Sequence, residues 1–117
     1  MPWVITRVCR DCVDTRCVEV CPVDCIYEYT GPPDPGIPNQ LFINPEECIN
    51  CRMCQSECPW EAPVEDLEIP AGFEDDIALN TLTLAHPERF VVPEVVDKPY
   101  PEFATVQANK QRWDWPL

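Results

Sequence analysis

The chain has 117 residues, enough for one small domain with an appendage. Its 21 acidic and 8 basic residues give a formal net charge of −13, which argues against nucleic acid and anionic membranes as partners and favours a partner with a basic face. The N-terminus lacks the pattern of a secretory signal, and no apolar stretch approaches the ~20 residues of a membrane span, so we expect a cytoplasmic monomer.

Short apolar stretches predict four strands, at 2–6, 26–29, 40–44 and 64–69. A short helix is predicted before each Cys-Pro pair, because Pro22 and Pro59 have no N–H and bias the preceding residue toward extended geometry. Strand, helix and strand then recur in both halves. The predicted fold is α+β, a small sandwich of two β-α-β halves related by a pseudo-twofold axis.

Two cysteine motifs reveal an internal duplication: CRDCVDTRCVEVCPVDC at 9–25 and CINCRMCQSECP at 48–59. An offset of 37 residues superimposes the last two cysteines before each proline, whereas an offset of 39 superimposes the first two. The first motif therefore carries a two-residue insertion after Cys12. Between the motifs, segment 30–39 contains four prolines and two glycines and is predicted to be a loop.

The cysteines end before residue 59, and we expect a domain boundary near residue 70. Residues 1–70 would form the cysteine-bearing domain and residues 71–117 a C-terminal extension that wraps it. Acids at the start of segment 73–86 and a proline after it predict one helix there. The remaining Pro-rich tail is expected to be extended and to dock through Trp113 and Trp115.

Nine cysteines in a reducing compartment indicate metal or redox chemistry, and an odd number cannot all pair as disulfides. Zinc remains an alternative, but it does not need a third closely spaced cysteine or a fourth that crosses the duplication. Iron–sulfur clusters fit better, since in bacterial motifs of this type the cysteine before proline binds the other cluster. One cluster is then expected on Cys21, Cys48, Cys51 and Cys54, and the other on Cys9, Cys17 and Cys58, with or without Cys12.

C-x2-C-x4-C-x3-C-P followed by C-x2-C-x2-C-x3-C-P resembles the motifs of the seven-iron bacterial ferredoxins, which belong to the two-cluster ferredoxins. The resemblance is close over residues 1–70 and loose beyond them. It implies a [3Fe–4S] cluster on Cys9, Cys17 and Cys58 with Cys12 unligated, and a [4Fe–4S] cluster on the other four cysteines. It also implies that Cys25 is a buried thiol that binds no iron.

The chain departs from this family at Arg16, where members often have an acid associated with proton transfer; that role would be absent or pass to Asp14 or Asp11. The loop at 30–39 is long for the family, and Trp60 stands where small residues are common. The lone histidine, His86, has no catalytic neighbour and is expected at the surface.

No nucleophile or acid–base pair is visible, so we expect an electron-transfer protein and not an enzyme. The predicted function is a soluble ferredoxin that carries single electrons between a reductase and an acceptor enzyme. Three alternatives remain: a permanent electron-transfer subunit of a larger oxidoreductase, a redox or oxygen sensor, and a ferredoxin with two [4Fe–4S] clusters that uses Cys12. Residues 61–76 carry seven acids and no base, and would form either a solvated face or a docking surface for a basic partner.

Overall fold

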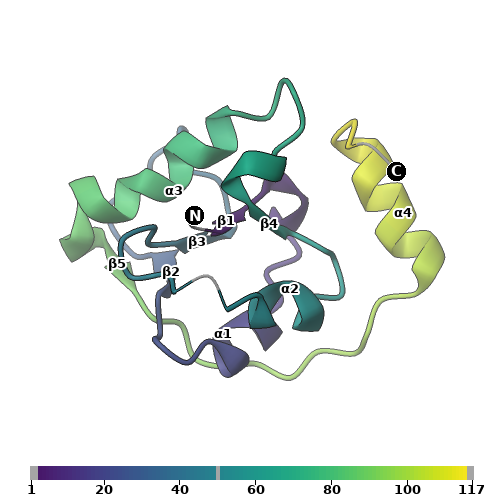
Figure 1. Cartoon of the computed structure of the whole chain (residues 1–117), viewed down its shortest axis with the longest axis horizontal. Helices are drawn as coiled ribbons and strands as arrows, with labels where there is room; N and C mark the ends of the chain where they lie inside the picture. Colours follow the sequence, from purple (N-terminus) through teal and green to yellow (C-terminus); the bar gives the residue numbers. More distant parts are fainter. Residues whose placement is uncertain (1–2, 50, 116–117) are drawn as a thin grey trace.

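The computed structural model describes residues 3–49 and 51–115 (Figure 1). Pro2 of the predicted first strand, Asn50 of the second cysteine motif and Pro116 of the tail lie outside the described residues. The described chain is a compact α+β structure. None of its helices combines the length and apolar character needed to cross a membrane.

Each half of the cysteine-bearing region contributes a strand, a helix and a strand. The first half contains β1 (Trp3–Ile5), the 3-10 helix η1 (Arg7–Cys9), α1 (Arg16–Val20) and β2 (Ile26–Tyr29). The second half contains β3 (Leu41–Ile43), α2 (Met53–Glu57), β4 (Pro63–Glu65) and the 3-10 helix η2 (Asp66–Glu68). The four predicted strands are present, but the prediction for the last was wrong beyond Glu65, where the chain turns into η2.

Strand pairing interlocks the two halves. β1 pairs antiparallel with β4, with Val4 opposite Val64, and β2 pairs antiparallel with β3, with Tyr27 opposite Phe42. Each pair therefore joins one strand of the first half to one of the second. All residues of β1 and β3 are buried, because the two strands lie against each other and the C-terminal extension covers them.

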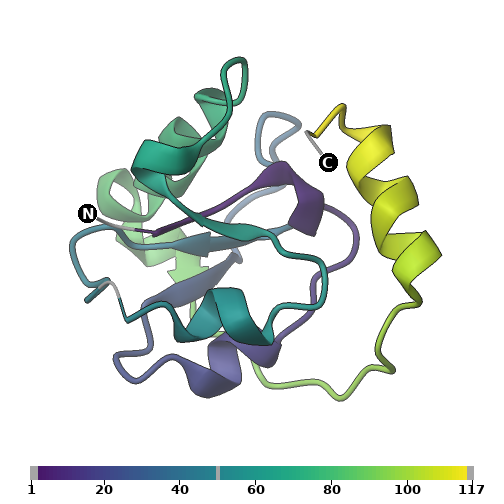
Figure 2. The same ribbon diagram turned by 45° about the vertical axis from the view of Figure 1, so that its right-hand side comes forward.

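Both short helices end at a cysteine that precedes a proline, as predicted. Cys21 caps the C-terminal end of α1, and Cys58 does the same for α2. Both cap residues have extended backbone geometry, which is the conformation that a following proline favours. The two helices pack against each other, so their ends lie close together in pairs (Figure 2).

The C-terminal extension contributes more secondary structure than expected. The predicted helix at 73–86 corresponds to α3 (Asp75–Ala85), which is followed by the 3-10 helix η3 (Pro87–Arg89) and by β5 (Phe90–Val91). β5 adds to the edge of β2 as a third strand. The tail was expected to be extended, yet it contains α4 (Phe103–Arg112), because no proline occurs between Pro101 and Pro116 and several good helix formers follow Pro101.

Helix α3 is joined to β1, β3 and η1 by two buried polar side chains. Asn80 accepts hydrogen bonds from the backbone N–H groups of Ile5 in β1 (3.1 Å) and Ile43 in β3 (2.8 Å), and donates one to the Ile5 carbonyl (2.9 Å). The Asn80 side chain thus hydrogen-bonds to the backbone of both β1 and β3, two strands that do not pair with each other. Asp76, fully buried, accepts from the backbone N–H (2.9 Å) and the guanidinium of Arg7, and lies 3.5 Å from Arg10.

Candidate metal centre

Four thiols, which we call set 1, gather where α1 begins and α2 ends: Cys9, Cys12, Cys17 and Cys58. Three of them are buried and Cys12 is half-buried. Burial first, and then the nearby Cys58 and Cys12, raises the pKa of Cys9, to about 12. Charges influence a pKa strongly only at short range, so Cys58 and Cys12 lie near Cys9.

The other two thiols of set 1 show the same relation. Burial raises the pKa of Cys17 well above its usual value, and Cys58, Cys9 and, to a smaller extent, Cys54 of the other motif's helix raise it further. Burial also raises the pKa of Cys58, whereas the backbone N–H groups of Ala62 and Trp60 lower it by hydrogen bonding to the sulfur. Such donors stabilise the thiolate, which is the form that binds metal. Metal binding must therefore release protons from this site.

The remaining five cysteines, which we call set 2, line one cavity: Cys21, Cys25, Cys48, Cys51 and Cys54. The rest of its wall is mostly apolar and includes Trp3, Ile26 and Ile43. The sulfur of Cys25 lies 3.6 Å from that of Cys21, and its backbone N–H also donates to the Cys21 sulfur at 3.5 Å. Burial and then Cys21 raise the pKa of the Cys25 thiol.

Each set mixes cysteines from both halves of the duplication. Cys58 of the second motif lies with the thiols of the first, and Cys21 of the first motif lies with those of the second. The packing of α1 against α2 causes this exchange, because each helix carries one cysteine of each set near its two ends. The structure therefore brings together the two groups of residues that the sequence predicted as ligands.

The duplication is also visible in backbone conformation. Val13 (φ 43°) and Arg52 (φ 68°) each follow the second cysteine of their motif, and both are left-handed. Asp24 (φ 50°) and Glu61 (φ 58°) are left-handed three residues after the cysteine that precedes proline. A left-handed conformation is strained for a β-branched residue such as Val13. Its recurrence at equivalent positions shows that both loops turn back in the same way around their thiols.

The donor set fits iron–sulfur clusters. Such clusters are held by cysteine thiolates, with four cysteines for a [4Fe–4S] cluster. Set 2 supplies the four expected thiols around one cavity with apolar walls, and Cys25 is a fifth. Within residues 3–49 and 51–115, no group of three Cys, His, Asp or Glu side chains is arranged to hold a single metal ion.

A segment of the tail, residues 96–100, lies over the loop of set 1, and we call it the strap. Val96 exchanges hydrogen bonds with the Thr15 hydroxyl, accepting at 3.1 Å and donating its N–H at 2.8 Å. The Lys98 ammonium donates to the carbonyls of Cys12 (2.9 Å) and Val13 (3.2 Å). In Figures 1 and 2 the tail passes along α1 on its way to α4. The strap thus holds the backbone on both sides of the inserted residues.

Helix α4 covers another side of set 1. Its Asn109 side chain donates to the buried carbonyl of Val8 at 2.8 Å, just before Cys9. Arg112 lies 3.1 Å from Asp11, and Lys110 lies 2.6 Å from Glu61. Every one of these contacts joins the tail to a residue near a thiol of set 1, so the C-terminal extension shields this set from solvent.

Replacing Lys98 with methionine is expected to expose set 1 by loosening the loop that carries Cys12. The variant loses charge-assisted hydrogen bonds to two carbonyls, so absorbance from the cluster bound there should decay ~5-fold faster in air. The matched control is Arg89→Met, which removes the same charge far from this loop and should decay at the wild-type rate. Equal decay of all three proteins would show that Lys98 does not hold the loop.

The other residues singled out in the sequence have structural partners. Asp14 is buried and forms an ion pair with Arg16, whose guanidinium stacks over the ring of Tyr100 at 3.7 Å from its centroid. Asp11 is exposed and is bound by Arg112. His86 lies at the end of α3, 46% exposed and 3.8 Å from Glu88, as expected for a surface residue.

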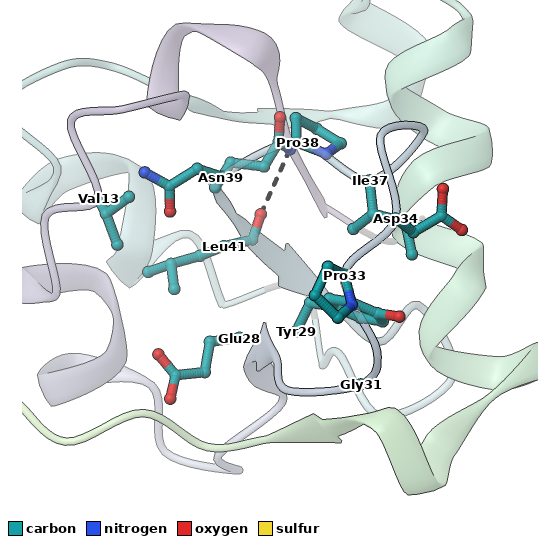
Figure 3. A pocket seen from close by; sticks show the side chains of 11 residues that line it. Val13, Glu28, Tyr29, Gly31, Pro33, Asp34, Ile37, Pro38, Asn39 and Leu41 are labelled. Carbon is teal, nitrogen blue, oxygen red and sulfur yellow. Dashed lines mark hydrogen bonds between the residues drawn. The ribbon is translucent and has the colours of Figure 1, made fainter.

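A second cavity, of about 360 Å³, lies under the long loop between the motifs (Figure 3). Prolines of the loop, Glu28, Tyr29 and Leu41 contribute to its wall, and none of the residues that line it is a cysteine. A hydrogen bond joins this loop to the segment between Cys9 and Cys12, because the Asp11 N–H donates to the Asn39 carbonyl at 2.8 Å. The cavity is thus separate from both groups of thiols.

Comparison with known families and proteins agrees with this arrangement. Residues 8–62 match a family described as a 4Fe-4S dicluster domain. This segment contains all nine cysteines and ends at the buried Ala62 beside Cys58.

Three bacterial proteins are similar to the chain. Ferredoxin-1 of Caulobacter vibrioides is 46% identical over 68 residues, which are 58% of this chain and 53% of that protein. A ferredoxin of Saccharopolyspora erythraea is 40% identical over 70 residues, 60% of this chain and 58% of that protein. A ferredoxin of Streptomyces griseus is 38% identical over 78 residues, 67% of both chains. The match thus spans between about half and two thirds of these relatives.

Proposed function

This chain belongs to the ferredoxin family, and we propose that it carries single electrons between a reductase and an acceptor enzyme through two iron–sulfur clusters. Its relatives are named ferredoxins, which are electron-transfer proteins and not enzymes. The observation that carries the proposal is the division of the cysteines into two sets at opposite ends of α1 and α2.

The spacing between the two sets suits electron transfer. Cys17 and Cys21 are four residues apart at the two ends of α1, and Cys54 and Cys58 stand in the same relation on α2. Four residues span ~6 Å along a helix. When bound, each cluster supplies a one-electron centre. The chain then holds its ligands so that the two centres are near neighbours.

We propose that set 1 binds a [3Fe–4S] cluster through Cys9, Cys17 and Cys58, and that Cys12 binds no iron. The two inserted residues lengthen the chain between Cys12 and Cys17, and Lys98 holds the carbonyls of Cys12 and Val13. Set 2 would bind a [4Fe–4S] cluster through Cys21, Cys48, Cys51 and Cys54. The position of Cys12 within set 1 also supports the alternative of two [4Fe–4S] clusters.

Iron counting distinguishes these two compositions. Protein purified without air should contain about seven irons per chain and give the paramagnetic resonance signal of an oxidised [3Fe–4S] cluster. Anaerobic purification is needed because clusters can lose iron on oxidation. Eight irons without that signal would support the alternative in which Cys12 is a ligand. Zinc in place of iron would contradict both.

A permanent subunit of a larger oxidoreductase is the second candidate. Exposed apolar side chains follow one another along the tail, where a permanent interface could cover them: Val91, Val92, Val95, Val96, Tyr100 and Phe103. Size-exclusion chromatography of protein from its native source separates the two candidates, since a carrier elutes alone and a subunit elutes with its complex. We propose a cytoplasmic monomer that binds neither nucleic acid nor membranes, because its net charge of −13 repels polyanions.

A further inference from the structure

The two sets of thiols differ in their access to solvent. In set 1, Cys9, Cys17 and Cys58 are 5%, 2% and 8% exposed. Cys25 and Cys54 of set 2 are buried as well (3% and 8%), and Cys12 of set 1 is half-buried, but Cys51 of set 2 is the one cysteine of the nine that is exposed. A protein that approaches the molecule can therefore come closer to set 2.

The C-terminal extension is the cause of this difference. The strap and α4 contact residues near set 1, through Cys12, Val8 and Glu61. In Figure 2, the segment that leads into α2 lies on one side of α2, and α4 lies on the opposite side. That segment carries Cys48 and Cys51 of set 2. The extension therefore covers one set and leaves the approach to the other open.

Two exposed apolar side chains line the cavity of set 2, Val23 (37% exposed) and Ile49 (58%), and Met53 (47%) is the next large exposed apolar residue along the chain; we call these three the apolar rim. Val23 and Ile49 line the cavity itself, and Met53 stands between Arg52 and Cys54, which also line it. Apolar side chains that stay exposed beside a functional site are typical of a protein interface.

Acidic residues lie around the apolar rim in the sequence and in space. Asp24 follows Val23, and Glu46 and Glu47 precede Cys48; all three are exposed. Glu47 accepts a hydrogen bond from the Tyr27 hydroxyl at 2.5 Å. Among the described residues that line the cavity, Arg52 is the one cation, and it is 3.8 Å from Glu65. The charge around the rim thus complements a basic surface.

We propose that the electron-transfer partner docks on the apolar rim and that electrons pass through set 2 to reach it. The partner is a redox protein with an apolar contact area ringed by lysine and arginine side chains. This inference rests on the proposed function and adds to it the side of the molecule that the partner uses. In each transfer one electron leaves the reduced protein and reduces one oxidised centre of the partner.

A basic haem protein, cytochrome c, serves as the probe for the docking site. Its zinc-substituted form cannot take part in the redox reaction, so calorimetry at low salt measures docking alone. The double variant Ile49→Gln/Met53→Gln removes apolar area without changing charge, and should weaken binding at least ~10-fold, as loss of the centre of an interface does. The matched control is Leu67→Gln/Phe103→Gln, two residues more exposed (69% and 79%) but away from the cavity. It should stay within ~2-fold of the wild type.

Only variants with wild-type iron content are compared. If Ile49→Gln lowers the iron content, because Ile49 is next to Cys48, Met53→Gln alone replaces the double variant. Stopped-flow mixing of dithionite-reduced protein with ferric cytochrome c then measures electron transfer. Weaker binding in the control pair, or unchanged binding in the rim variant, overturns the docking site. Electron transfer by the wild-type protein still supports the proposed function in that case. Wild-type protein that accepts electrons from dithionite and passes none to the haem overturns the proposed function itself.

Discussion

Replacing Asn80 with leucine is expected to lower the free energy of unfolding by ~3–5 kcal/mol. Leucine has a similar size but no polar atoms, so the buried N–H groups of Ile5 and Ile43 lose their acceptor. Each buried donor without a partner costs ~1–3 kcal/mol, and Asn80 is only 1% exposed, so water cannot replace the amide. The carbonyl of Ile5 keeps the Gln40 amide as a donor at 3.2 Å.

Thermal unfolding followed by circular dichroism measures this effect as a midpoint lowered by more than ~10 °C. The midpoint is used because a protein that releases metal on unfolding does not follow a simple two-state equilibrium. Asn39→Ala is the matched control, since its exposed amide makes one long contact to Asp11 at 3.4 Å. A midpoint for Asn80→Leu within ~2 °C of the wild type would show that α3 does not support the strands through this residue.

Replacing Cys58 with alanine is expected to remove the cluster of set 1, although Cys58 belongs to the second motif. Its sulfur lies with Cys9 and Cys17, and two thiols are too few for a cluster unless Cys12 takes part. The iron content of anaerobically purified protein should fall by about three per chain, and the signal of the oxidised three-iron cluster should disappear. The absorbance of the [4Fe–4S] cluster that we propose for set 2 should remain.

Cys12→Ala is the matched control for this prediction. It removes a thiol from the same set, but we expect the iron content to stay at the wild-type value, because in the proposed composition Cys12 binds no iron. If Cys58→Ala loses the [4Fe–4S] cluster instead, the ligands do not cross between the halves. If Cys12→Ala loses iron from set 1, the two-residue insertion does not keep this thiol away from the cluster.

The sequence alone predicted the grouping of the cysteines and the strands that hold them. Motif spacing assigned Cys58 to the thiols of the first motif and Cys21 to those of the second, and the structure brings the same residues together. This was possible because the information is local. Each short helix must end before a proline, so the spacing of the cysteines fixes which end of the helix each one occupies.

Only the tertiary structure showed what the C-terminal extension does. Asn80 meets Ile5 across 75 residues, and Lys98 meets Cys12 across 86. Neither residue is part of a motif or of a periodic pattern, so nothing in its neighbourhood predicts its partner. Helix α4 was missed for a related reason, since the prolines around it suggested an extended tail and its packing on Val8 is invisible in the sequence. The unequal exposure of the two sets of thiols follows from these long-range contacts. Which thiols the C-terminal extension shields depends on where distant segments meet, and the local spacing of residues does not encode that.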